Sequence, residues 1–120
     1  MQYLVRLGVI SSLVVLTCPS AYACSIPETI PIPDGKTASE KEMLSADAAI
    51  KDYISRLLDY TDCIEQETHV LRSNAVRGDM ASTKSREESA AKLQNEAAAA
   101  IEKVAEQFNR SIANYKERGL

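Results

Sequence analysis

The sequence has few of the residues that build thick cores and active sites. It contains no Trp, one Phe and one His among 120 residues. A chain this poor in aromatic side chains buries its apolar surface most naturally by packing helix against helix. With a single His, no Gly-rich phosphate loop and no nucleophile beside a base, the sequence offers no catalytic site. We therefore predict a non-enzymatic protein without a cofactor.

An excess of positive charge is also missing. The chain has 17 acidic and 14 basic residues, which gives a formal net charge of −3. Proteins that bind DNA or RNA gather Lys and Arg to neutralise phosphates. This charge balance argues against a nucleic-acid partner.

The most apolar stretch of the sequence lies at its N-terminus. Arg6 precedes an apolar run over residues 7–16, which is too short to span a bilayer as a helix. Ala21 and Ala23 then supply the small residues that a signal peptidase requires. We predict a signal peptide over residues 1–23, export to the periplasm or to the medium, and no membrane span after cleavage.

Cleavage after residue 23 leaves two cysteines, Cys24 and Cys63. Exported proteins reach an oxidising compartment, and two cysteines allow one intramolecular disulfide, which we predict. Two alternatives stay open. One is an intermolecular bridge, and the other is a bacterial lipoprotein whose lipid is attached to Cys24. Against the second, Ala21 and Tyr22 stand where a lipoprotein signal normally has Leu and a small residue.

Residues 24–36 are predicted to form an extended strap. Prolines fix φ and remove backbone donors, which favours polyproline-like geometry over a helix. The prolines and the glycine of the strap are Pro27, Pro31, Pro33 and Gly35. Its apolar residues, which can lie against a helix, are Ile26, Ile30 and Ile32.

The first predicted helix covers residues 38–73, approximately. Thr37 and Ser39 are each followed three residues later by Glu, in capping-box spacing. Apolar residues then recur every seven positions, with a second row three residues on that Glu67 interrupts. The two rows are Met43, Ile50, Leu57, Ile64 and Leu71, and Ala46, Tyr53 and Tyr60.

A second helix is predicted at about 80–117, after a turn at about 74–79. Asn74 and Gly78 tolerate the left-handed backbone of a turn, and Asp79 can cap the following helix. Residues 97–100 are four alanines, which we interpret as a surface for close helix packing. The apolar stripe of this helix is Ala90, Leu93, Ala97, Ile101, Val104, Phe108, Ile112 and Tyr115.

These elements predict an all-α fold, a long antiparallel two-helix hairpin whose Pro-rich N-terminal strap is pinned by one disulfide. The lengths agree with this arrangement. The helix from residue 38 to Cys63 is about 38 Å long at about 1.5 Å per residue. The residues from Cys24 to the helix start reach about 37 to 43 Å at about 3.1 Å each. A strap that runs back along the first helix therefore reaches Cys63 when it is almost fully extended.

One cluster of polar residues has the spacing of metal ligands. Asp62, Glu65 and His69 follow one another at helical intervals, so consecutive members share a helix face. A solvated polar face near a helix end is the more ordinary explanation of this spacing. The sequence identifies no residue that would supply a fourth ligand.

The order of these features resembles small periplasmic proteins of Gram-negative bacteria. It comprises a mature N-terminal Cys, a strap that ends in Pro33-Asp34-Gly35, an acidic capped helix with Lys51-Asp52-Tyr53, Cys63, and a closing Phe108-Asn109 to Tyr115-Lys116 stretch. That group has no established activity, so the resemblance implies export and compactness.

The function expected from the sequence is that of a structural or interaction module acting through helix surfaces. Its partner is an unknown protein or a second copy, which would give a four-helix dimer. Two alternatives differ in class. One is a lipoprotein tethered to a membrane through Cys24, and the other is a periplasmic chaperone or stress-binding protein, which needs an exposed apolar groove.

Overall fold

All regular structure in the described part of the chain is helical. The computed structural model describes residues 24–74 and 80–119. In these residues it contains helix α1, Glu40–Asn74, helix α2, Met80–Glu117, and no strand. The all-helical prediction is therefore confirmed. The predicted signal peptide and residues 75–79 of the predicted turn lie outside the described residues.

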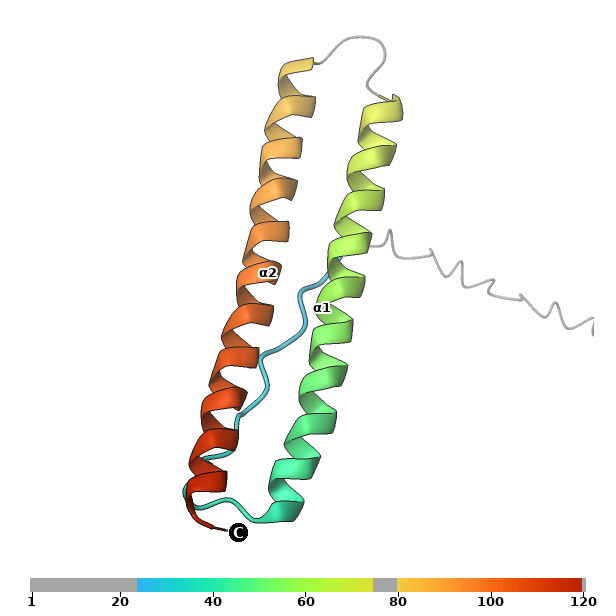
Figure 1. Ribbon diagram of the computed structural model, residues 1–120. Coiled ribbons are helices and arrows are strands. Elements are labelled where there is room, and N and C mark those ends of the chain that lie inside the picture. Colours follow the sequence, from blue (N-terminus) through green and yellow to red (C-terminus); the bar gives the residue numbers. More distant parts are fainter. Residues whose placement is uncertain (1–23, 75–79, 120) are drawn as a thin grey trace, which may run out of the picture.

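The two helices lie side by side and run in opposite directions (Figure 1). The guanidinium of Arg118, which follows α2, donates a hydrogen bond of 2.6 Å to the carbonyl oxygen of Ala38, which precedes α1. The residues just before α1 and just after α2 therefore meet at one end of the molecule.

A turn centred on Asp34 leads the chain into α1. Its carbonyl oxygen accepts the N–H groups of Thr37 and Ala38 at 3.0 and 2.8 Å. Its side-chain Oδ1 accepts the N–H of Lys36 at 2.9 Å. Thr37, one of the two predicted caps, also donates its hydroxyl to the Asp34 carbonyl at 3.4 Å. This turn connects the strap to the start of α1.

Ser39 and Glu42 form the capping box at the start of α1. The Ser39 hydroxyl oxygen accepts the Glu42 N–H at 3.3 Å, and Glu42 Oε2 accepts the Ser39 N–H and hydroxyl at 2.7 Å each. Two of the N–H groups that no helical carbonyl can reach are thereby satisfied. The helix begins directly after Ser39, at Glu40, rather than at about residue 38.

The capping box makes stability depend on pH. The hydrogen bond from the backbone N–H of Ser39, followed by that from its hydroxyl, lowers the pKa of Glu42 from its ordinary value of 4.5. A carboxyl whose pKa is lower in the folded state adds stability above its unfolded pKa, and this stability is lost as pH falls through the folded value. We expect Glu42→Gln to be less stable than wild type near neutral pH, and the difference to narrow below about pH 4.

Urea unfolding of wild type and Glu42→Gln between about pH 7 and about pH 3 checks this expectation. Glu40→Gln is the matched control, because it removes a charge from the same helix turn. A difference between wild type and Glu42→Gln that stayed constant with pH would show that the Glu42 charge is not responsible.

The core is a narrow layer of side chains between the helices. The predicted apolar rows of α1 are buried from Met43 to Ile64, and Leu57 is 0% exposed. In the alanine run of α2, Ala97 is 0% exposed, whereas Ala98 and Ala99 face solvent. The buried residues in the two helices are Met43, Ala46, Ile50, Tyr53, Leu57, Tyr60, Ile64, Ala97, Val104, Phe108 and Ser111.

Residues 24–36, the strap, have no helix or strand and cross over the helix pair. Figure 1 shows them, in blue, from a point part-way along α1 to the end where α1 begins. Ile30 and Ile32 pack against the core as partly buried residues, whereas Ile26 is 52% exposed. The strap therefore covers part of the core with two of its three isoleucines.

Four residues hold the end of the strap against α2, and we call them the clasp: Pro33, Gly35, Ser111 and Arg118. The buried Ser111 hydroxyl donates a 2.6 Å hydrogen bond to the carbonyl of Pro33. Arg118 donates to the carbonyl of Gly35 at 3.2 Å. A Cβ on Gly35 would lie only 1.8 Å from the carbonyl oxygen of Ser111. Gly35 is therefore in direct contact with the α2 backbone.

Burial in the helix pair ends close to where the strap begins. In α1 the last buried residue is Ile64, which follows Cys63, and in α2 the first is Ala97. The described residues 65–73 and 80–96, which we call the outer helix ends, contain no buried residue. Leu71, which continues the predicted row, is half-buried, and Leu93 is 36% exposed.

Candidate functional site

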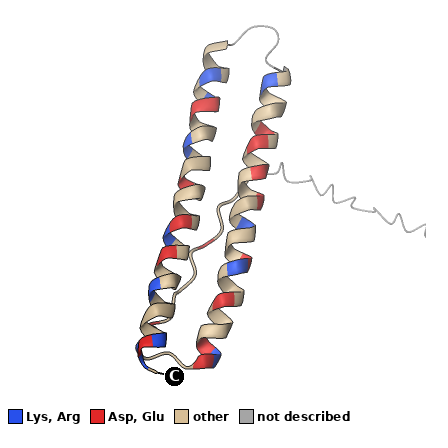
Figure 2. Ribbon diagram, in the orientation of Figure 1, with Lys and Arg blue, Asp and Glu red and all other residues tan. Residues whose placement is uncertain are grey.

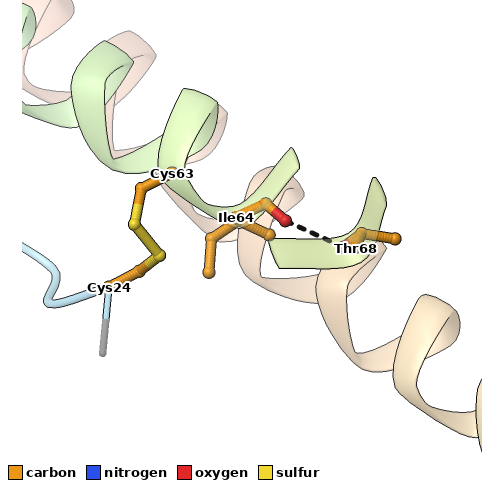
Figure 3. The surroundings of a disulfide bond; sticks show 4 residues. All are labelled: Cys24, Cys63, Ile64 and Thr68. Carbon is orange, nitrogen blue, oxygen red and sulfur yellow. Dashed lines mark hydrogen bonds between the residues drawn. A yellow bond between two sulfur atoms is a disulfide. The ribbon is translucent and has the colours of Figure 1, made fainter. Parts of the chain in front are cut away.

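The first feature of the candidate site is the covalent link between the strap and α1. Cys24 and Cys63 are joined by a disulfide across 39 positions of sequence, with their Cα atoms 5.8 Å apart. This separation lies within the ordinary range for disulfides. Figure 3 shows the bond leaving the side of α1 toward the start of the strap. The predicted Cys24–Cys63 pair is therefore confirmed.

The position of Cys63 on α1 explains why it meets the strap and not the core. Ile64 is 5% exposed and packs in the core. Successive helix residues are rotated by about 100°, so Cys63 lies at the edge of the buried face and is half-buried. The neighbouring Thr68 donates its hydroxyl to the carbonyl of Ile64 at 2.8 Å (Figure 3), which satisfies its polar atom within the helix.

Glu67 brings a carboxylate to the disulfide. It follows Cys63 by four residues, about one helix turn. One carboxylate oxygen of Glu67 and the two sulfurs all lie within 4.8 Å of one another. Glu67 is exposed, and both cysteines are half-buried. In the sequence this residue was visible only as an interruption of an apolar row, although its spacing from Cys63 placed the two on one helix face.

The two sulfurs and the carboxylate are atom types that bind metals, but the sulfurs are not in the thiolate form that metal binding requires. Soft metals bind cysteine as thiolate. The sulfurs of Cys24 and Cys63 are joined to each other, so neither is a thiolate. The cluster is therefore a disulfide with an adjacent carboxylate.

The three residues with predicted metal-ligand spacing are not brought together as a cluster of ligand atoms. Asp62, Glu65 and His69 are all exposed on α1. Glu65 and His69 line a cleft of about 350 Å³ between the outer helix ends, and Asp62 is not among its lining residues. That cleft contains an ion pair between Arg72 of α1 and Glu87 of α2. Its polar groups connect the two helices to each other.

Polar groups in the described core are fully satisfied. Among residues 24–74 and 80–119, every buried side-chain nitrogen or oxygen has a hydrogen-bond partner. The buried Ser111 hydroxyl, for example, is engaged with Pro33. Two ion pairs between residues four positions apart lie on the surface of α1, Lys51–Asp47 at 2.6 Å and Arg56–Asp52 at 3.0 Å. They are exposed and contribute little to stability.

Comparisons with protein-family models, with curated proteins and with solved structures find no match. Neither α1 nor α2 has, within the described ranges, an apolar stretch long enough to cross a membrane. The features on which a function can be argued are therefore those of the structure itself. They are the disulfide with Glu67, the clasp, and the contrast between two parts of the helix pair. The part with buried residues, up to Ile64 in α1 and from Ala97 in α2, is called the strapped part, and the outer helix ends have none.

Proposed function

We propose that this chain is an exported, non-enzymatic protein that acts as a structural or interaction module through its helix surfaces. Its working form is an antiparallel two-helix hairpin closed by the Pro-rich strap. The observation that carries the proposal is the division of the helix pair. Its strapped part has a buried core from Ala38 to Ile64 and from Ala97 to Ser111, and its outer helix ends have no buried residue.

The outer helix ends are the part of the hairpin that gains most from a partner. Val70 and Met80 are 54% and 85% exposed there, and Leu93 is 36% exposed. Apolar side chains on helices without a core are stabilised when another helix packs against them. The partner we propose is helical protein, either a second copy that completes a four-helix arrangement or another exported chain.

Export is supported by the apolar N-terminal run and by the disulfide. Disulfides persist in oxidising compartments and are rare in the cytosol.

The disulfide also argues against the lipoprotein alternative, because a lipid thioether would use the same Cys24 sulfur that is bonded to Cys63. The chaperone alternative has less support, because the exposed large apolar residues are spread over the strap and both helices: Ile26, Leu44, Leu58, Val70, Met80 and Leu93.

Intact-mass measurement of the natural protein tests export and processing. We expect the mass of a chain that begins at Cys24 and has lost two hydrogens to one disulfide. Retention of residues 1–23 would contradict export with cleavage. The additional mass of a diacylglycerol on a chain that begins at Cys24 would support the lipoprotein instead.

Site-specific photo-crosslinking tests the interaction surface. A photoreactive residue is placed at Val70 or Leu93 in the outer helix ends, and at Leu44 or Leu58 as controls of similar exposure in the strapped part of α1. We expect crosslinks to protein mainly from Val70 and Leu93, and mass spectrometry of the products distinguishes a second copy from another chain. Equal yields at all four positions, or higher yields at Leu44 and Leu58, would contradict the proposal.

A further inference from the structure

The disulfide lies in an acidic stretch of α1. Between Arg56 and Arg72 the helix carries four carboxylates and neither Lys nor Arg, and Figure 2 shows red bands and no blue on this part of α1. The four acidic residues are Asp59, Asp62, Glu65 and Glu67. Asp59 and Glu67 stand four residues before and four residues after Cys63, so they share its helix face and place negative charge beside it.

Glu67 is the member of this group that reaches the sulfurs. Its carboxylate oxygen and both sulfurs lie within 4.8 Å of one another, with Glu67 exposed and the cysteines half-buried. Two unit charges at about this distance interact appreciably even in bulk water. The Glu67 carboxylate therefore repels any negative charge that develops on the two sulfurs.

Opening a disulfide by thiols develops negative charge there. A thiolate attacks one sulfur, forms a mixed disulfide with it, and expels the other cysteine as a thiolate. A second thiolate attacks the mixed disulfide, which releases the remaining protein thiolate and the oxidised reagent disulfide. Two electrons pass from the two thiols to the protein disulfide. In each transition state one negative charge is shared by three sulfurs, within the field of the nearby carboxylate.

We propose that Glu67 protects the Cys24–Cys63 disulfide from anionic thiols and so keeps it a permanent closure of the strap. The main physiological thiol reductant, glutathione, belongs to this anionic class. Protection by Glu67 concerns the covalent lock itself and goes beyond the proposed interaction function. It holds whether or not the outer helix ends bind a partner.

The test measures second-order rate constants for reduction of the oxidised protein by three small thiols that differ in charge. They are cysteamine, with an ammonium group, 2-mercaptoethanol, with a neutral hydroxyl, and 3-mercaptopropionate, with a carboxylate. The variants are Glu67→Gln, Glu67→Lys and the control Glu65→Gln. Glu65 loses the same charge from the same helix but is outside the sulfur cluster.

We expect Glu67→Gln to accelerate reduction by 2-mercaptoethanol about threefold at low ionic strength. The acceleration should be larger for 3-mercaptopropionate, smaller for cysteamine, and greater again in Glu67→Lys. It should nearly vanish in about 1 M salt, where charges more than about 3 Å apart are screened. Glu65→Gln should change the rates less than twofold.

Two results would overturn the proposal. The first is equal rates of reduction by 3-mercaptopropionate in wild type and Glu67→Gln at low salt. The second is an acceleration independent of reagent charge and of salt, because that would mean the substitution loosens the strap. Thermal unfolding of the oxidised variants identifies such loosening separately.

Discussion

Gly35→Ala is expected to lower the free energy of unfolding by about 3 kcal/mol. The added Cβ would lie 1.8 Å from the carbonyl oxygen of Ser111 and 2.9 Å from the backbone nitrogen of Tyr115. Both atoms belong to the backbone of α2, which cannot move aside without breaking helix hydrogen bonds. The strap must therefore move away from α2. The cost of overpacking is then increased by the loss of the hydrogen bonds that Ser111 and Arg118 donate to the strap.

Urea unfolding of oxidised wild type and Gly35→Ala measures this loss. Gly35 has no positive φ, so the expected cost is steric and does not come from an unusual backbone conformation. Gly119→Ala is the opposite control, because Gly119 has a φ of 71° and nothing within 4 Å of an added Cβ. It is expected to cost about 1 kcal/mol or less. Equal stability of Gly35→Ala and wild type would mean that the strap is not docked on α2.

Loss of the disulfide is the second large effect. Replacing both Cys24 and Cys63 by Ala is expected to lower the free energy of unfolding by about 4 kcal/mol. The bond closes a loop across 39 positions, and the cost reflects the freedom that the unfolded chain regains when the loop opens. For a domain whose whole stability is about 5 to 15 kcal/mol, this is a large fraction.

The measurement compares denaturant midpoints of the oxidised wild type and the double variant. Reduced wild type is a second reference, because it lacks the bond but keeps both sulfur atoms. Reduced wild type and the double variant should unfold at nearly the same denaturant concentration, well below the oxidised protein. Coincident midpoints for all three would show that the Cys24–Cys63 bond does not restrict the unfolded chain.

The α1 part of the core could be predicted from residue spacing. Met43, Ile50, Leu57 and Ile64 recur at the period of one helix face, and all four are buried. The same pattern continues to Leu71, which is only half-buried. Periodicity identifies the face of a helix that can be buried, but the length over which it is buried depends on what covers it. Here that length corresponds to the reach of the strap.

The clasp could not be predicted from apolar patterns. The predicted stripe includes Ile112, but the more deeply buried residue is its neighbour Ser111. A polar side chain can be buried because it is hydrogen-bonded, here to the carbonyl of Pro33. Gly35 reads in sequence as an ordinary loop glycine. A side chain is excluded at Gly35 because the backbone of α2, more than seventy residues later in the sequence, occupies the space that a Cβ would need.

The candidate site was predictable in its covalent part only. Two cysteines in a chain predicted to be exported, joined by a strap of suitable length, predicted the Cys24–Cys63 bond. Glu67 lay outside the predicted site because helical spacing alone does not show which carboxylate approaches a bond formed with a distant segment. The cluster of Asp62, Glu65 and His69 shared a spacing, but its members are not gathered around one point.

Hydrogen exchange of backbone amides, followed segment by segment in the oxidised protein, tests the central claim most directly. The claim is that the strap and its disulfide define the extent of the stable core. We expect slow exchange in the α1 residues 43–64 and the α2 residues 97–115, and exchange faster by orders of magnitude in the outer helix ends. Uniform protection along both helices, or stronger protection in the outer helix ends, would contradict the claim.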